Sequence, residues 1–510
     1  MLKTLIGREL LDNLMTFRFA AAVFIMLLLV VANTAVLIKD YERRLEGYNT
    51  ALKAHDQQLQ ERKTYSAGAL DLFRPPNPLS IFNVGLDKRL GNEIWVTHGF
   101  VPTLWDAKMY GTSSLLNLFS SIDIVFIFEV VLSLMALIFA YDALAGERER
   151  GTLRLVLTHP VSRGQILFAK YISAMLCLLV PLLMSLILAV ILLTTSTVIS
   201  LSIGDFLRIS GIVFASIVYL SVFYCIGLLI SAATRRTGTA LMLAMFVWGF
   251  WVLVYPNVIL TAIAPPHASQ ARMVSAFDQI KQIWEEFDRE RKHFLANDAV
   301  PGEDPHFGMR GEDPNFGTQG GSDFNYAYFY ENSSILEYHY LAGSHIEKLR
   351  EESEPQVPHA QNYYRFLGAQ IVDTAEQASL VRRPTLETVF FQPAQVDRIL
   401  LRFSPVGMYD AATQAWAGTG LLGLKDFFEA ARRYRRTLID YYYDEKVFGS
   451  RQWFSADRGA VDWKNLPQFS FQRSDISVNA ARALPDICLL VIINLVLFVG
   501  IYLVFQRSEV

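Results

Sequence analysis

Asp123 and Glu129 are acidic side chains within one apolar run of this 510-residue chain. An ionisable group in the middle of a membrane helix costs about 2.5–3.5 kcal/mol on insertion scales, and residues that carry this cost commonly belong to ion or substrate pathways. Glu129 in mid-span, with Asp123 near the outer end of the same helix, is therefore a candidate for an intramembrane pathway. The alternative is a protonated or hydrogen-bonded Glu at a helix interface, and the sequence leaves both open.

The charged segment that follows this run supplies a second set of candidates. It reads Gly146-Glu-Arg-Glu-Arg-Gly-Thr-Leu-Arg-Leu-Val-Leu-Thr-His-Pro-Val-Ser-Arg163, with charges first, then apolar residues, then a break at Pro160. Ser162 and Gln165 fit a capping box that begins the next helix. We expect a short surface helix between two membrane helices, placed to push on the membrane part. A loop that is merely positively charged is the alternative.

Signatures of common enzymes are missing from the sequence, which has no H-E-x-x-H, G-x-S-x-G or G-x-x-x-x-G-K-[ST] motif. We expect no catalytic residue and no cofactor in this chain, so any ATP-driven work needs a second chain that binds ATP and Mg²⁺. No metal site is expected, because His339 and His345 are six residues apart and do not share a helix face as ligands at i and i+4 would. The net charge of −3 excludes a dedicated nucleic-acid binder.

Composition places these residues in a membrane, because 52% of the chain is hydrophobic and only 19% is charged. Six apolar runs reach the roughly 20 residues that a helix needs to cross a bilayer core. The predicted order is an amphipathic cytoplasmic helix over 1–18, spans over 19–38, 121–140, 167–194, 210–232, 240–263 and 484–505, a first extracytoplasmic region over 39–120, a cytoplasmic coupling loop over 141–166 and a large extracytoplasmic domain over 264–483.

The distribution of basic residues predicts the orientation. Lysine and arginine are concentrated in the loop over 142–170 and in the turn at 235–236, whereas the short loop between the third and fourth spans has only Arg208. By the positive-inside rule, both termini are cytoplasmic and the head lies beyond a plasma (inner) membrane. The sequence thus predicts an all-α polytopic membrane protein with six transmembrane helices and a large, mainly helical extracytoplasmic head.

Local signals predict the helices of the head. The polar, Pro-free stretch from Tyr41 to Tyr65 suits a helix that continues out of the membrane. Ser404 and Pro405 suit an N-cap and first turn, and Leu421–Val447 carries one apolar stripe. A short extended stretch is expected near 468–471.

Two charged features of the head each have a structural and a functional interpretation. Arginines 432, 433, 435 and 436 are expected on a solvated face, with a lipid headgroup or a partner as the alternative. The repeated acidic segments 302–308 and 311–317 lack the spacing of an EF-hand and predict a surface loop, with Ca²⁺ binding as the alternative.

The segment from Gly146 to Lys170 resembles the cytoplasmic loop of permease subunits of type-2 ABC transporters, in which a charged E-R-E-x-G-T-L segment and a P-V-S-R turn lead into the third span. Ser231–Leu241 is similar to the turn between spans four and five of that family, and the amphipathic Met1–Phe17 is similar to its N-terminal connecting helix. Arg402-Phe-Ser-Pro405 and Trp416-Ala-Gly-Thr-Gly420 resemble a subgroup with a large extracytoplasmic insert before the last span.

The resemblance implies a half-transporter in which two permeases, identical or homologous, pair in the lipid bilayer and each docks an ABC ATPase subunit. It implies that the ATPase contacts the coupling loop, at Glu147, Arg148, Glu149, Gly151, Thr152, Leu153, Pro160 and Arg163. Movement of that partner would tilt the helices and drive export of a substrate.

Three functions remain open at this level. The first is ATP-driven export of a substrate through a partner ATPase. The second is mechanotransmission, in which the head acts on an extracytoplasmic protein and no solute crosses. The third is an ATP-independent receptor or scaffold.

Overall fold

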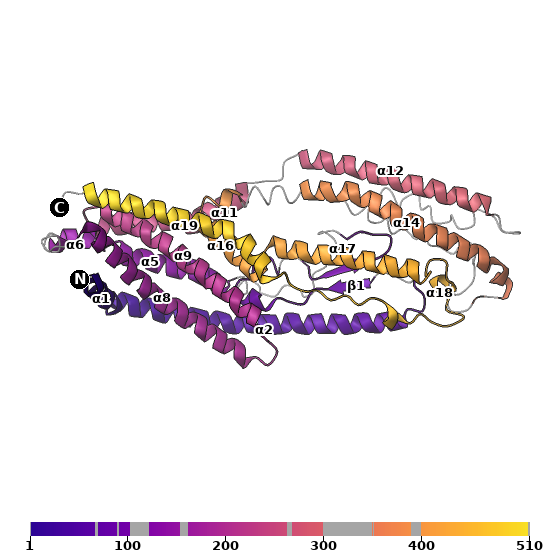
Figure 1. Ribbon diagram of the computed structural model, residues 1–510, viewed down its shortest axis with the longest axis horizontal. Coiled ribbons are helices and arrows are strands. Elements are labelled where there is room, and N and C mark those ends of the chain that lie inside the picture. Colours follow the sequence, from indigo (N-terminus) through magenta and orange to yellow (C-terminus); the bar gives the residue numbers. More distant parts are fainter. Residues whose placement is uncertain are drawn as a thin grey trace.

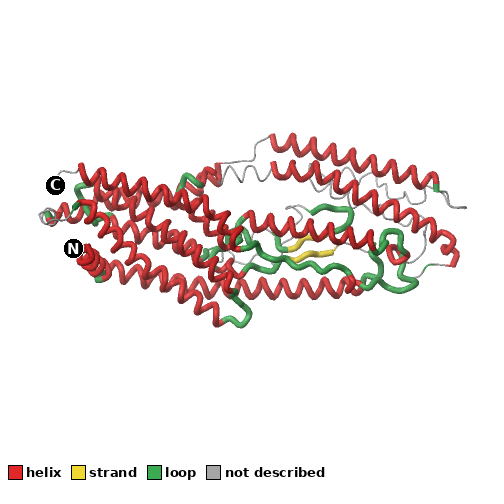
Figure 2. Tube along the Cα trace, in the orientation of Figure 1, coloured by secondary structure: helices red, strands yellow, loops and turns green. Residues whose placement is uncertain are grey.

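The computed structural model describes residues 2–66, 70–88, 91–102, 122–153, 162–262, 268–298, 349, 351–388 and 399–507. The molecule is elongated, with a bundle of membrane helices at one end and the head at the other (Figure 1). Most of the described chain is helical, and the short strands β1 and β2 lie in the head (Figure 2). Both acidic repeats and the two histidines 339 and 345 lie outside the described residues.

The membrane part contains most of the helices. They are α1 (Leu2–Leu14), α2 (Phe17–Glu61), α4 (Ile124–Ile127), the π-helix η3 (Phe128–Leu132), α5 (Ser133–Ala140), α6 (Ala145–Glu149), α8 (Arg163–Thr195), α9 (Ile203–Ala233), α10 (Thr237–Trp248), the π-helix η4 (Gly249–Val254), α11 (Tyr255–Ala262), α16 (Pro405–Ala417) and α19 (Ile476–Arg507).

Six helices of the described chain are long and apolar enough to cross a membrane. They are Phe19–Glu61, Ile124–Glu149, Arg163–Thr195, Ile203–Ala233, Thr237–Ile259 and Ile476–Arg507. This confirms the predicted all-α fold with six membrane helices. The first of them is part of α2, whose 45 residues are about 68 Å long at 1.5 Å per residue. As the polar stretch after Tyr41 predicts, α2 runs on from the membrane part along the head (Figure 1).

The head is built on α2 together with helices from the second half of the chain. Its elements are β1 (Leu70–Phe73), η1 (Pro78–Ile81), β2 (Glu93–Val96), α12 (Ala268–Asn297), η6 (Glu351–Gln356), α14 (Val357–Leu386), α17 (Leu421–Asp444), α18 (Arg451–Phe454) and η8 (Trp463–Asn465). The two strands pair antiparallel, with Leu70 opposite Val96. Residues 468–471 are in neither a helix nor a strand, and the paired strands β1 and β2 were not predicted from the sequence.

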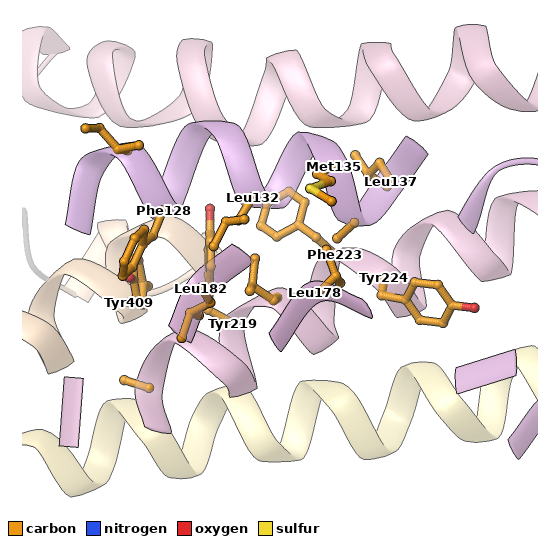
Figure 3. Close-up of a cluster of buried hydrophobic side chains, with 14 of the residues drawn as sticks. Phe128, Leu132, Met135, Leu137, Leu178, Leu182, Tyr219, Phe223, Tyr224 and Tyr409 are labelled. Atoms are coloured by element: carbon orange, nitrogen blue, oxygen red, sulfur yellow. The ribbon is translucent and has the colours of Figure 1, made fainter. Parts of the chain in front are cut away.

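Helix α16 lies among the membrane helices although its sequence belongs to the region predicted as extracytoplasmic. It packs between α9 and α19. Met408 packs with Val222 and Leu490, both well inside their spans, and Figure 3 shows Tyr409 beside Tyr219 of α9. With 13 residues, α16 is too short to be recognised as a span, and its apolar face is covered by neighbours that are distant in sequence.

The solvated face expected for the arginines of α17 is wrong for two of the four. Arg435 is buried, and its guanidinium donates to the carbonyl oxygens of Thr97 (3.1 Å) and His98 (2.6 Å) and to Glu376. Arg432 donates to the carbonyl of Pro102 at 3.2 Å, and burial lowers the pKa of its guanidinium. Arg433 and Arg436 are exposed as expected. The helix therefore buries charge where the strand segment offers free carbonyls.

Arg435→Met should lower the free energy of unfolding by about 1–3 kcal/mol, because the carbonyls of Thr97 and His98 lose a buried donor. Thermal unfolding followed by tryptophan fluorescence measures this, since the Trp453 ring packs against the His98 ring with centroids 5.1 Å apart. The exposed neighbour supplies the control: Arg433→Met should change stability by no more than about 0.5 kcal/mol. Equal effects of the two variants would contradict the assignment.

Candidate functional site

The coupling segment begins at the end of α5 and is held there by α9. The backbone N–H groups of Leu144 and Ala145 donate to the Ser231 hydroxyl at 3.0 and 2.9 Å. One turn earlier on α9, Gly227 allows the close approach, because a side chain there would overlap Ala140 and Leu137. Small residues on α9 thus bring helix α6 directly against the membrane bundle.

Lys170 is the central charge of the site. Its ammonium is 4% exposed and pairs with Glu147 of α6 at 2.7 Å and with Glu9 of α1 at 3.0 Å. The backbone carbonyl of Lys170 accepts a hydrogen bond from the Tyr224 hydroxyl of α9 at 3.1 Å. A buried ammonium is stable only when it is paired and hydrogen-bonded, so this one side chain fixes α1, α6 and α8 relative to one another.

The next two residues of the segment tie it to the turn between α9 and α10. Arg148 donates to the carbonyl oxygens of Thr234 (2.7 Å) and Ala232 (3.3 Å) at the C-terminal end of α9. Glu149 accepts from the backbone N–H (3.0 Å) and the hydroxyl (2.7 Å) of Thr237, which begins α10. A cation at a helix C-terminus and a carboxylate at a helix N-terminus are both favoured by the helix dipole.

The segment turns outward after Glu149. Gly151 has φ +74°, a left-handed conformation that ends the helix and favours glycine, and the Thr152 hydroxyl donates to the carbonyl of Glu147 at 3.2 Å. Leu153 is fully buried. Among residues 144–153, the exposed ones are Glu149, Arg150, Gly151 and Thr152. Residues 154–161 of the segment in which a short surface helix is expected, Pro160 among them, lie outside the described residues.

Arg163 closes the segment against the last membrane helix. The predicted capping box is confirmed, with the Ser162 hydroxyl accepting from the N–H of Gln165 at 3.3 Å and the Gln165 side chain accepting from the N–H of Ser162 at 3.2 Å. Arg163 donates to the carbonyls of Phe505 (2.8 Å) and Gln506 (2.9 Å) in the last turn of α19. The segment, α1 and both chain ends therefore lie together at the end of the molecule opposite the head (Figure 1).

The two acidic residues proposed for a pathway have different surroundings. Asp123 is the N-cap of α4, and its carboxylate accepts from the N–H groups of Phe126 (2.7 Å) and Val84 (2.9 Å). Glu129 lies in η3 and is 4% exposed, and its carboxyl group is near that of Asp410 in α16. A second acidic side chain therefore lies near Glu129, although the two are 281 residues apart in the chain.

Lys170, Ser231 and Asp410 are site residues that sequence reasoning did not single out for these contacts. Lys170 carried a signal, since it is a lone cation at the start of a long apolar helix and needs a counter-charge. Asp410 carried none, because its helix is short and its partner is remote. Among the described residues, no group of three or more His, Cys, Asp or Glu side chains is arranged to hold a metal ion.

Comparison with known proteins identifies the family of this chain. The family described as "ABC-2 family transporter protein" matches residues 4–293, more than half of the chain. The chain belongs to the ABC-2 transporter family. A second family, described as "Domain of unknown function (DUF3526)", matches residues 369–472, which include α16 and α17. The protein is therefore a member of a transporter family, with several helices that can span a membrane.

Two curated relatives are similar to part of the chain. Both carry the description "Probable ABC transporter permease protein NosY". The protein from Pseudomonas aeruginosa is 33% identical over 133 residues, and the one from Stutzerimonas stutzeri is 35% identical over 133 residues. Each match covers 26% of this chain and 47% of the relative, so the chain spans about half the length of the curated relatives it matches.

A double-mutant cycle measures the Lys170 pairing. Lys170→Met should destabilise the protein, and Glu147→Gln in the same chain should remove part of that cost, because the carboxylate left without its cation is then gone. We expect an interaction energy of about 0.5–3 kcal/mol from thermal unfolding of the purified protein. As a control, Lys170→Met is combined with Asp205→Asn in the first turn of α9. The effects of these two changes on the free energy of unfolding should be additive within about 0.5 kcal/mol. Additivity of the first pair would show that the contact contributes nothing.

Proposed function

We propose that this permease couples ATP hydrolysis by a separate ATPase subunit to work on the far side of a plasma (inner) membrane. The observation that carries the proposal is the set of braces on the coupling segment: Glu147 to Lys170, Arg148 to the end of α9 and Glu149 to the start of α10. A force applied to the exposed part of the segment would reach all of these helices together. ATP and Mg²⁺ would be bound by the partner, and this chain would supply no cofactor.

The exposed tip of the segment is the proposed contact for the ATPase. Arg150, Gly151 and Thr152 are exposed beside the exposed Glu149, whereas Glu147 and Arg148 bind Lys170 and Thr234 of this chain. We infer that these two residues act as braces that pass on movement and that the tip, continued by the residues up to Pro160, makes the contact. Both termini would then be cytoplasmic, because they lie at the same end as the segment (Figure 1).

Lipid and a second permease would cover the outside of the bundle. Large apolar side chains such as Phe246 of α10 and Val496 of α19 are 73% and 66% exposed. Such surfaces are stable only against lipid tails or another protein. A second copy of this chain, or a homologue, is the proposed partner within the membrane.

Two kinds of work are compatible with ATP coupling. One is export of a substrate. The other is mechanotransmission through the head to an extracytoplasmic protein, and one observation favours it: α2 is continuous from the membrane part into the head, where Trp463 donates to the carbonyl of Arg62 (2.6 Å) and Val461 to that of Lys63 (3.2 Å) just beyond its end. Displacement of α2 in the membrane would therefore move the far part of the head.

Glu147→Gln should uncouple the complex without preventing its assembly. The variant loses the ion pair that ties the segment to α8, and the proposed docking tip is unchanged. We expect ATP hydrolysis stimulated by the permease to fall by about 5- to 150-fold, the range of a 1–3 kcal/mol coupling energy, while the ATPase still co-purifies. Lys281→Gln, an exposed head position, serves as the control. Full stimulation in Glu147→Gln would rule out the brace.

Gly47 offers a test of mechanotransmission along α2. A Cβ at Gly47 meets nothing within 4 Å, so Gly47→Ala should preserve or slightly strengthen the helix. Gly47→Pro should break it at a cost of about 3 kcal/mol. In reconstituted vesicles with the ATPase, ATP should change the trypsin sensitivity of the head in wild type and Gly47→Ala, and this change should be lost in Gly47→Pro. An intact response in the proline variant would argue for export as the output.

A further inference from the structure

The turn between α16 and α17 lies where the membrane helices meet the head. α16 ends at Ala417, and Gly418 has φ +70°, the left-handed conformation that commonly ends a helix. α17 begins at Leu421 and leads away along the head (Figure 1). Residues 418–420 therefore join a helix that is packed among the membrane helices to a long helix of the head. We call residues 416–420 the junction turn.

Trp416 holds the junction turn against α9. A Cβ at Gly211 of α9 would overlap the indole ring of Trp416, so the ring lies directly on the backbone of that helix. The indole N–H is buried and has no hydrogen-bond partner among the described residues, although a buried tryptophan N–H usually finds one. Packing on Gly211, rather than a hydrogen bond, therefore places this ring.

Asparagine side chains bind the last carbonyl oxygens of α16, where a helix leaves its own carbonyls unpaired. Asn479, in the first turn of α19, donates to the carbonyl of Trp416 at 3.4 Å. Asn77, the N-cap of η1, donates to the carbonyl of Ala417 at 2.8 Å. Both asparagines are buried. The junction turn is thus bound to α19 and to the start of η1 as well as to α9.

The segment around η1 connects the junction turn to α2. The backbone N–H of Leu86 donates to the carbonyl of Thr419 at 2.9 Å. Arg44 of α2 donates to the Ser80 hydroxyl at 2.8 Å and pairs with Asp87 at 2.9 Å. The membrane helices α2, α9 and α19 therefore meet at the junction turn, α2 through this segment and the other two directly.

Two of these helices also hold the coupling segment at their other ends. Arg148 binds the carbonyl of Thr234 just after α9, and Arg163 binds the carbonyl of Phe505 in the last turn of α19. The two helices have 31 and 32 residues, so each is about 47 Å long at 1.5 Å per residue. Movement of the coupling segment would therefore reach the junction turn through both helices.

We propose that the junction turn is a clamp that fixes the head-side ends of α2, α9 and α19 to one another and passes their movement to α17. The clamp depends on the indole ring of Trp416 over Gly211 and on the bound carbonyls of the turn. Its closed form is a property of this chain alone. Its role in moving the head rests on the proposed coupling to an ATPase, and it adds the contacts through which α9 and α19 would act beside α2.

Hydrogen exchange at the Leu86 amide reports whether the clamp is closed, because this N–H donates to the junction turn. In the full-length protein in lipid nanodiscs, Gly211→Ala should speed this exchange by about tenfold or more, since the added methyl forces the ring and the turn away from α9 and opens the structure locally. Gly500→Ala in α19, where a Cβ meets nothing within 4 Å, is the matched control and should exchange as the wild type does. Strand β2 should be equally protected in every variant, which shows that the head remains folded.

Changing the ring tests the same contact without adding an overlap. Trp416→Leu should also speed exchange at Leu86, because the turn loses its packing on α9. Adding Gly211→Ala to Trp416→Leu should have little further effect, since the smaller side chain leaves room for the methyl. Unchanged exchange at Leu86 in either single variant, or effects of the two substitutions that simply multiply, would overturn the clamp.

Reconstitution with the ATPase tests whether the clamp moves the head. Gly211→Ala should retain the ATP hydrolysis that the permease stimulates, because the contacts of the coupling segment are unchanged, and should lose the ATP-dependent change in trypsin sensitivity of the head. A wild-type permease that stimulates no ATP hydrolysis would refute the proposed function but not the clamp, which the exchange experiment measures without the ATPase. A head response that survives in Gly211→Ala would refute transmission through the junction turn.

Discussion

The buried ammonium of Lys170 is the contact on which the rest of the membrane end depends. An ion of this kind has a desolvation cost of several kcal/mol, which only close counter-charges offset. The two carboxylates come from α1 and α6, elements separated by more than 130 residues. Because neither carboxylate can leave without exposing a charge to the protein interior, the connecting helix, the coupling segment and α8 are constrained to move as one body.

At the opposite end of the membrane helices, buried ion pairs also join the bundle to the head. Arg44 of α2 pairs with Asp87 at 2.9 Å, and Asp87 also pairs with Arg74 at 3.1 Å. Asp205, at the start of α9, pairs with Arg473 just before α19 at 2.8 Å. Charges therefore brace both ends of the membrane helices, while the region between them is held by apolar packing (Figure 3). Such an arrangement transmits rotation and tilt better than a bundle held by apolar contacts, which are not directional.

Local signals in the sequence predicted local structure well. Six apolar runs, the capping box at Ser162 and the N-cap at Ser404 each depend on residues within a few positions of one another, and each is found in the structure. Burial of Arg435 was not predictable in this way, because the carbonyls that it binds belong to a strand segment more than 330 residues earlier. The pairing of Glu147 was not predictable either. Its carboxylate was expected to contact a partner, but in the fold it pairs with Lys170 of the next membrane helix.

Among the links between the membrane helices and the head, α2 and α16 differ in what they can transmit. α2 is a continuous helix, so it conveys displacement along and about its axis as a rigid rod. α16 is short, and it is held in the bundle by apolar packing of residues such as Met408 and by a hydrogen bond from Ser404 to the carbonyl of Trp251. Movement of α1 and α2 at the Lys170 end would be conveyed along α2 to the head. The packing of α16 among the membrane helices would limit how far the head follows.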